Sequence, residues 1–449
     1  MTFIFKVTSH LLLSCFLLSC QQNNKIREDK TVDHWAESLY RCKPSHVFKQ
    51  NGMYATGLVC ADLNDNGFMD VITGNGNDMS QQPITVNNNW GFATGVPYSY
   101  ANYAQDLGYN TKIKVGDLNQ DGWLDVIVVS VFERADFNPL YFASQSDALP
   151  PGFFKTGEIR VYLNNEGVLP QTASYKVQLD TFPFDIDLGD LDGDGDLDLV
   201  VANIGKMNNF GDLEPSKSVI CFNDNGILTN ELIWETDAAF YGMSVKCADI
   251  NLDGYLDIIL GHVPGHFTEN SASSNGSISV FYGGKNVDDS FNIDSKIGRS
   301  FDIGKSIAAA TINIGLLYEG ENSVPNIKDM SIVVGGQYIR HVENTFDLIR
   351  SHGAVNLINN DKDDFFLIGY EEKNILWQTK SSEMGVSKPS FSAIGDLNND
   401  GIADLVLGFF KMHNGSLNEG APFYIFQGQK NDGSKPKFAQ VFQSSSTGV

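Results

Sequence analysis

Basic side chains are scarce in this chain. Lys and Arg number 31 among 449 residues, against 55 Asp and Glu, and the formal net charge is −24. A surface that binds nucleic acid needs a basic footprint, because its Lys and Arg side chains neutralise phosphates. The charge balance therefore argues against DNA or RNA as a partner.

Signatures of common enzyme classes are missing as well. The sequence has no HExxH pair, nucleophile elbow or P-loop, and no GxGxxG element between a strand and a helix. No Pro-rich or Ser-rich linker divides it either. A chain of this length normally splits into several domains, so the unbroken stretch 41–449 favours a repeat array that forms one unit.

The apolar stretch at the N-terminus, residues 11–19, is too short to span a bilayer as a helix. Lys6 precedes it and Cys20 follows it, as in an export signal. An ordinary cleaved secretion signal is one interpretation. Lipid attachment at Cys20 is the other, with Cys15 as a second candidate for the acylated cysteine.

The residues around Cys20 favour lipid attachment. Leu17-Leu-Ser-Cys20 resembles the lipobox of bacterial lipoproteins. That resemblance implies that residues 1–19 are a signal peptide, that Cys20 carries lipid, and that residues 20–40 are a polar tether. It also implies an exported protein anchored to a bacterial membrane, and Gln21 is compatible with the outer membrane or cell surface.

What the chain has in abundance is one nine-residue pattern. Oxygen-bearing side chains occupy positions 1, 3, 5 and 9, glycine occupies position 6, and the pattern occurs five times. We name each copy by its first residue, as the 62, 117, 190, 249 and 396 loops. The oxygen-bearing residues are Asp62, Asn64, Asn66 and Asp70; Asp117, Asn119, Asp121 and Asp125; Asp190, Asp192, Asp194 and Asp198; Asp249, Asn251, Asp253 and Asp257; and Asp396, Asn398, Asp400 and Asp404.

Oxygen ligands at alternate positions of a tight loop suit a hard cation such as Ca²⁺, to which position 7 would add its backbone carbonyl. The five loops contain 17 of the 55 acidic residues, so much of the acidity is explained as ligand chemistry. We expect four to five calcium sites. The 62 loop has only Asp62 and Asp70 as charged ligands and should bind most weakly.

The segments that flank the loops read as β-strands. Short β-branched runs such as Val126-Ile-Val128 and Leu199-Val-Val201 follow the loops, and alternating apolar residues precede them. The residue before each first Asp is small, which predicts that another backbone passes close to it. These small residues are Ala61, Gly116, Gly189, Ala248 and Gly395.

A sixth, degenerate repeat lies between residues 300 and 340. Ile307–Thr311 matches the first strand and Ser331–Gly335 the second, with an insertion in place of the acidic loop. Later strands are predicted in each unit: Pro83–Asn87, Glu158–Leu163, Ser218–Phe222, Ser277–Tyr282, Ala354–Ile358 and Phe423–Phe426. The repeats begin about 55 to 85 residues apart and contain only strands, which indicates a β-propeller or a similar array.

These loops and the strands after them resemble the FG-GAP/VCBS repeats, which also form the propellers of integrin α subunits. The resemblance covers roughly residues 45–445. It implies an all-β fold, a β-propeller of four-stranded blades, with calcium in the loop joining the two innermost strands of most blades. Six repeats are recognisable, and a further strand near Ser45–Lys49 leaves six or seven blades open.

Four cysteines follow the export signal. Cys60 and Cys247 lie where other repeats have Val, Leu or Ile, so a small buried apolar role fits them. Cys42–Cys60 and Cys221–Cys247 are possible disulfides in an oxidising compartment, although spacing does not fix connectivity.

The long connections between second and third strands predict a ligand-binding face opposite the calcium loops. The longest, about 130–157, is rich in aromatics and includes Phe137 and Tyr141. Histidines, among them His262, follow three consecutive second strands, and Arg340 lies beside His341.

Three functions are compatible with this pattern. The first is a binding or adhesion module for a glycan or protein ligand at the cell surface, without catalysis, in which Phe137, Tyr141, Arg340 and His341 contact the ligand. The second is a polysaccharide lyase that uses His, Tyr and Arg on the same face. The third is a purely structural surface protein. We expect the first function, because aromatic residues are unusual in solvent-exposed loops that bind nothing.

Overall fold

The computed structural model describes the greater part of the repeat region. The described residues are 55–76, 81–90, 98–103, 105–131, 157–207, 213–229, 234–251, 253–262, 275–286, 291–305, 307–316, 318–319, 330–338, 354–359, 375–380, 389–398, 400–409, 423–430 and 440–443. Within these ranges the chain forms strands and turns, and no helix is long and apolar enough to cross a membrane.

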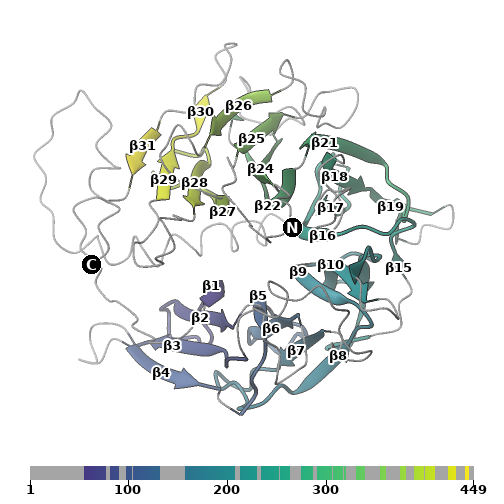
Figure 1. The fold of residues 1–449 in the computed structure, drawn as a ribbon. Helices are drawn as coiled ribbons and strands as arrows, with labels where there is room; N and C mark the ends of the chain where they lie inside the picture. Colours follow the sequence, from purple (N-terminus) through teal and green to yellow (C-terminus); the bar gives the residue numbers. More distant parts are fainter. Residues whose placement is uncertain are drawn as a thin grey trace, which may run out of the picture. The chain divides into compact units, whose positions relative to one another are not determined.

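The fold is all-β and consists of the small antiparallel sheets of a β-propeller (Figure 1). Each sheet contains four consecutive main strands, as the sequence predicts. Sheet 1 is β1(Ala55–Ala61), β2(Asp70–Asn75), β3(Thr85–Asn89) and β4(Tyr98–Asn102); sheet 2 is β5(Asn110–Gly116), β6(Asp125–Ser130), β7(Glu158–Tyr162) and β8(Tyr175–Gln178). Sheet 3 is β9(Phe182–Gly189), β10(Asp198–Met207), β12(Val219–Cys221) and β15(Trp234–Glu235), with β11(Leu213–Glu214) on the far end of β10.

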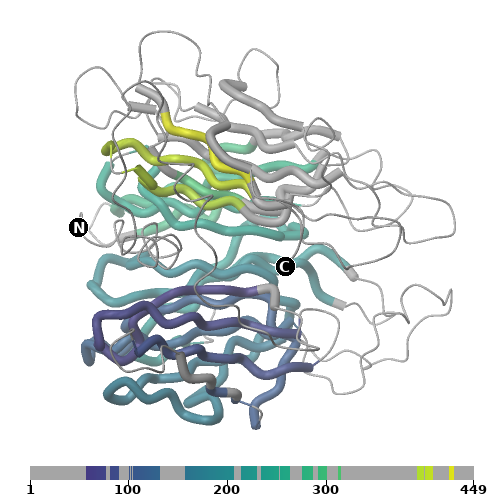
Figure 2. The backbone as a smooth tube through the Cα atoms, turned by 90° about the vertical axis from the view of Figure 1, so that its left-hand side faces the viewer, coloured from purple at the N-terminus to yellow at the C-terminus, as the bar shows by residue number. Residues whose placement is uncertain are grey.

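The remaining described sheets follow the same order. Sheet 4 is β16(Gly242–Ala248), β17(Asp257–His262), β18(Asn275–Phe281) and β21(Arg299–Lys305). Sheet 5 is β22(Ile307–Leu316), β24(Met330–Tyr338), β25(Ala354–Asn359) and β26(Ile375–Lys380); sheet 6 is β27(Pro389–Gly395), β28(Asp404–Phe409), β29(Phe423–Phe426) and β31(Gln440–Gln443). Figure 2 traces the backbone of these strands.

Short two-stranded pairs complete the described strands. They are β13(Asn223–Asp224) with β14(Ile227–Leu228), β19(Gly283–Lys285) with β20(Phe291–Ile293), and the parallel pair β23(Tyr318–Glu319) with β30(Gln429–Lys430). By compactness the chain divides into two units. Sheets 1 to 4 lie in one unit, and sheets 5 and 6, from Ala310 on, lie in the other.

The five acidic loops all join a first strand to a second strand in one register. In each, the small residue before the first Asp pairs with the Asp at position 9. The pairs are Ala61↔Asp70, Gly116↔Asp125, Gly189↔Asp198, Ala248↔Asp257 and Gly395↔Asp404. The last strand pair before the turn is therefore the same in every loop, which is why the spacing is constant.

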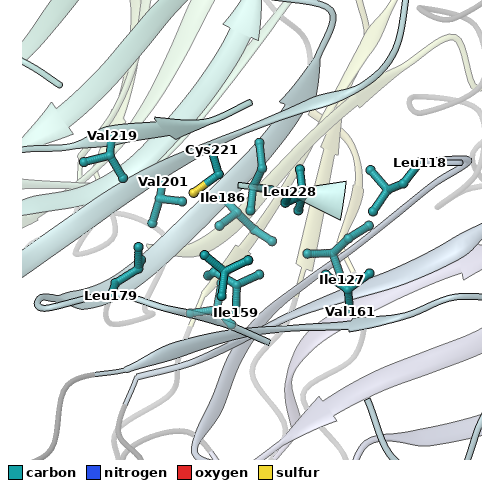
Figure 3. Close-up of a cluster of buried hydrophobic side chains, with 13 residues drawn as sticks. Leu118, Ile127, Ile159, Val161, Leu179, Ile186, Val201, Val219, Cys221 and Leu228 are labelled. Atoms are coloured by element: carbon teal, nitrogen blue, oxygen red, sulfur yellow. The ribbon is translucent and has the colours of Figure 1, made fainter. Parts of the chain in front are cut away.

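The second strand of a sheet is buried on both faces. In β10, Leu199 and Val201 pack into the cluster shared with sheet 2, whereas Val200 and Ala202 pack into the cluster shared with sheet 4. Figure 3 shows the first of these clusters, in which Ile127 and Val161 of sheet 2 meet the side chains of sheet 3. This two-sided burial explains the continuous apolar runs after the loops.

At Gly116 and Gly189, the small residue before the loop faces a side chain and not a backbone. A Cβ on Gly116 would lie 2.8 Å from Cδ1 of Leu197, and one on Gly189 would lie 2.7 Å from Cδ1 of Leu256. Each leucine is the position 8 residue of the next loop along the chain. At these two positions the expected close approach is present, but the neighbour is a side chain and not the predicted backbone.

Charges join the first strands of sheets 2, 3 and 4. Lys114 on β5 places its Nζ 2.6 Å from Oδ1 of Asp187 on β9, and Nζ of Lys246 on β16 lies 3.8 Å from the same oxygen. The other oxygen of Asp187 accepts the backbone N–H of Cys247 at 3.0 Å, and Asp185 accepts that of Val245 at 3.2 Å. Carboxylates of one edge strand thus satisfy the open N–H groups of the next.

Two expectations need correction. The degenerate repeat does form sheet 5, but β22 continues through Thr311 to Leu316 and does not end where the acidic loop would begin. Without an Asp and a Gly to make the turn, the strand runs on. Cys221 and Cys247 are free thiols, so the pairing left open between them is not formed, and Cys42 lies outside the described residues.

Substitution of Gly116 by Val should lower stability by about 1–3 kcal/mol, because the added methyl groups overpack the leucine of the next sheet. The free energy of unfolding in urea measures the effect. Gly116→Ala should cost less, since a leucine end can shift. Gly116→Val combined with Leu197→Ala should be less destabilised than the sum of the single changes. Strict additivity would contradict the contact.

Candidate metal centres in the repeated loops

The carboxylate at position 9 of each loop is buried and accepts two backbone N–H groups. In the 117 loop, Oδ2 of Asp125 accepts from Leu118 at 2.9 Å, and Oδ1 accepts from Asn164, just past the third strand, at 2.8 Å. Asp198 does the same with Leu191 at 2.8 Å and Asn223 at 2.9 Å. The residue thereby ties the loop to its own second and third strands.

The other three loops repeat this arrangement. Asp70 accepts from Leu63 and Asn89, Asp257 from Ile250 and Gly283, and Asp404 from Leu397 and Gly428, at distances of 2.6–3.0 Å. All five position 9 residues have 0% exposure. Burial raises the pKa of Asp198 and Asp257 to about 7, and that of Asp70, Asp125 and Asp404 to about 6.

The carboxylate at position 1 shapes the turn. Asp117 accepts the backbone N–H groups of Asp121 at 3.1 Å and Gly122 at 2.9 Å. The 62, 249 and 396 loops contain the same two bonds. The glycine at position 6 has φ between 83° and 98° in all five loops, a conformation that a side chain would strain.

Positions 3 and 5 differ between loops in a way that matters for a cation. In the 117, 249 and 396 loops the Asn at position 3 donates its amide to the Asp at position 5, at 2.8–2.9 Å. The amide hydrogens there lie against a carboxylate that a metal would otherwise neutralise. In the 62 loop the Oδ1 of Asn64 is buried and accepts no hydrogen bond among the described atoms.

The 190 loop has a carboxylate at position 3 in place of an amide. The ligand atoms of Asp190, Asp192 and Asp194 lie within 4.8 Å of one another, and among the described residues no other trio of His, Cys, Asp or Glu does so. Burial and the neighbouring carboxylates raise the pKa of Asp192. The same causes raise the pKa of Asp196 to about 6. Such crowded like charges favour a bound cation.

The donor sets fit a hard divalent cation. Positions 1, 3 and 5 of each loop offer carboxylate or amide oxygens at the turn, and the unpartnered oxygen of Asn64 is suited to a ligand role. Position 9 is already engaged through both oxygens, although each carboxylate oxygen retains a further lone pair. Calcium at these residues stays a prediction, and position 9 has a structural role that the spacing did not reveal.

The sequence did not identify the residues near the third strand whose N–H groups bind the position 9 carboxylates. Asn164 and Asn223 were not singled out as site residues, because their distance from the loop varies between repeats. The available signal was an Asn shortly after a predicted third strand, as in Val161-Tyr-Leu-Asn164.

The expected ligand contacts Phe137, Tyr141, Arg340 and His341 lie outside the described residues. The expected lipidation site, Cys20, lies outside them as well. His262 is described and is only 3% exposed, stacked at 4.1 Å on the ring of Phe240, with Nε2 2.9 Å from Oγ of Ser279. Burial lowers the pKa of His262 to about 3, so it is a neutral core residue and not part of a surface.

Asp198→Asn and Asp192→Asn should separate the structural carboxylate from the ligand. The amide at position 198 retains one acceptor and turns a donor toward a backbone N–H, so the calcium-free protein should lose about 1–3 kcal/mol. Asp192→Asn removes one of the crowded charges, so it should not lower that stability, but it should reduce the rise in Tm that calcium produces. Thermal unfolding at pH 8, with calcium and with chelator, measures both. Equal behaviour of the two variants would contradict the distinction.

Chelated protein should lose stability as the pH is raised from 5 to 8. The five position 9 carboxyls titrate near 6–7 when folded, against about 3.9 when unfolded, so their stabilising protonation is lost as the pH rises through 6–7. His262, with its pKa lowered to about 3, works in the opposite direction below pH 6.5, but it is one group against five. A Tm that climbs over this range would refute the prediction.

Comparison with known proteins identifies the repeat type. A model of the FG-GAP-like repeat matches residues 151–201, which include β9, the 190 loop and the beginning of β10. The β-propeller fold is consistent with the FG-GAP repeat family. No curated protein matches the sequence.

Proposed function

We propose that this FG-GAP-repeat propeller is a calcium-stabilised binding or adhesion module that catalyses no reaction. The observation that carries the proposal is the common architecture of the five loops, in which a buried position 9 carboxylate binds the backbone N–H of position 2, between the oxygen-bearing residues of positions 1 and 3. Calcium at these positions would neutralise carboxylates crowded at the ends of the sheets. Because it would bind the folded state and not the unfolded chain, it would stabilise the fold by mass action.

The ligand surface in this proposal is the opposite end of the sheets. Because β5 and β6 are antiparallel and joined by the 117 loop, the connection from β6 to β7 leaves from the other end of sheet 2, after Ser130, and returns at Gly157. Its aromatic composition suits stacking on sugar rings or packing on a protein partner. Phe137 and Tyr141 in this connection, and Arg340 with His341, are the proposed contacts.

The proposal extends to the place where the module works. The lipobox-like Leu17–Cys20 supports export and attachment through Cys20, which would leave residues 20–40 as a tether to a bacterial outer membrane or cell surface. The net charge of −24 favours a neutral or basic ligand over a polyanion. That preference also counts against the lyase alternative, whose substrate would be anionic.

Replacement of residues 132–156 by a short Gly/Ser linker should abolish binding to glycans or surface proteins on an array while leaving the calcium-dependent Tm within a few degrees of the parent. In a binding module, His341→Ala removes one of four proposed contacts and should cost less than about 1 kcal/mol, or about fivefold in affinity, since most interface residues cost no more than that. Release of unsaturated sugars from an anionic polysaccharide by the parent, lost in His341→Ala, would instead establish a lyase.

A further inference from the structure

An asparagine joins the 62 loop of sheet 1 to the 117 loop of sheet 2. The side-chain amide of Asn164 donates to the carbonyl of Leu63, position 2 of the 62 loop, at 2.7 Å. Its backbone N–H donates to Asp125, position 9 of the 117 loop, at 2.8 Å. Asn164 is 2% exposed, so both bonds are shielded from water.

A second asparagine repeats the connection one sheet further along. The amide of Asn223 donates to the carbonyl of Leu118, position 2 of the 117 loop, at 2.8 Å. Its backbone N–H donates to Asp198, position 9 of the 190 loop, at 2.9 Å. Two consecutive interfaces between sheets therefore use the same residue type in the same way.

The two asparagines and the position 9 carboxylates form one continuous chain of hydrogen bonds. Asp125 accepts from both Asn164 and the N–H of Leu118, and the carbonyl of Leu118 accepts from Asn223. Asp198 then accepts from Asn223 and from Leu191, position 2 of the 190 loop. We call this chain, from Leu63 to Leu191, the loop relay.

Two tight turns, each just after a relay asparagine, pack closely against the preceding loops. A Cβ on Gly167 would lie 3.0 Å from Cα and Cβ of Asn64, and one on Gly226 would lie 2.6 Å from Cβ of Asn119. Both glycines have positive φ, at 85° and 89°. Asn64 and Asn119 hold position 3 of their loops, so each turn rests directly on a proposed ligand of the preceding loop.

The loop relay does not continue to the 249 loop. Position 9 of that loop, Asp257, accepts from the N–H of Gly283 at 2.9 Å, as Asp198 accepts from Asn223. Gly283 has no side-chain amide to donate to the carbonyl of Leu191. The backbone hydrogen bond to position 9 is present, but no side chain at this position reaches the preceding loop.

We propose that the loop relay couples metal binding at the 62, 117 and 190 loops, so that calcium fills these three with positive cooperativity and fills the 249 loop independently. The proposal rests on the proposed calcium function. The carbonyl that accepts each relay bond belongs to the peptide linking position 2 to the ligand at position 3. A cation that orders this peptide in one loop also orders the asparagine, and hence the next loop binds at a smaller entropic cost.

The sequence supplies a reporter for one of these loops. Trp123 is the position 7 residue of the 117 loop, and its indole can sensitise luminescence from Tb³⁺ bound as a substitute for calcium. Tb³⁺ is titrated into chelator-treated, full-length protein at about 0.15 M salt, which screens distant charges. Trp123→Phe gives the background from other tryptophans, and Tyr255→Trp in that background moves the reporter to the 249 loop.

Disabling the 190 loop by Asp192→Ala with Asp194→Ala should raise the Tb³⁺ midpoint at the 117 loop about fivefold or more. The reporter in the 249 loop should not move. In an Asn223→Ala protein, the same disabling should leave the midpoint at the 117 loop unchanged, which completes a double-mutant cycle. If Asn223→Ala fails to fold, the comparison of the 117 and 249 reporters decides alone.

The contrary results are distinct from one another. The coupling is overturned if the Tb³⁺ midpoint at the 117 loop does not change when the 190 loop is disabled. It is also overturned if the midpoint at the 249 loop shifts as much as that at the 117 loop. Either result leaves calcium binding intact. No sensitised emission from either reporter would instead overturn the calcium function itself.

Discussion

The rest of the structure depends on a buried carboxylate that accepts two backbone N–H groups. In each of the five loops the Asp at position 9 lies at the start of the second strand, and its oxygens accept the N–H of position 2 and an N–H at or just past the end of the third strand. Removing a carboxylate from water costs several kcal/mol unless hydrogen bonds replace the lost hydration. Two bonds replace part of it, and the raised pKa shows that the replacement is incomplete. A nearby cation would complete it.

The packing of the sheets follows from the same geometry. With both ends of the turn fixed at the pair Gly189↔Asp198, the side chains of β10 alternate between two neighbours, Leu199 toward sheet 2 and Val200 toward sheet 4. A slip of one residue would exchange these two sets. The loop therefore sets the register on which the hydrophobic contacts between consecutive sheets depend.

Local spacing made most of the fold predictable. The loops, the strands beside them and the segments Glu158–Leu163 and Phe423–Phe426 agree with β7 and β29, because each depends on residues close in sequence. The contacts between repeats were not predictable. The leucine against Gly116 and the amide of Asn164 act across sheets, and no short pattern encodes which repeat lies beside which. Sheet 5 shows the limit from the other side, since β22 without the acidic turn ran past its expected end.

The lysine and aspartate side chains on the first strands bear on how a chain of similar repeats finds its correct order. Sheets with interchangeable hydrophobic faces invite a repeat to dock on the wrong neighbour during synthesis. If sheet 4 docked on sheet 2 in place of sheet 3, Lys246 would face Lys114 without Asp187 between them. Two ammonium groups in that position repel each other and leave N–H groups of β16 unpaired. The alternation of lysine and aspartate on these strands thus favours the correct neighbouring sheet over the next one along the chain.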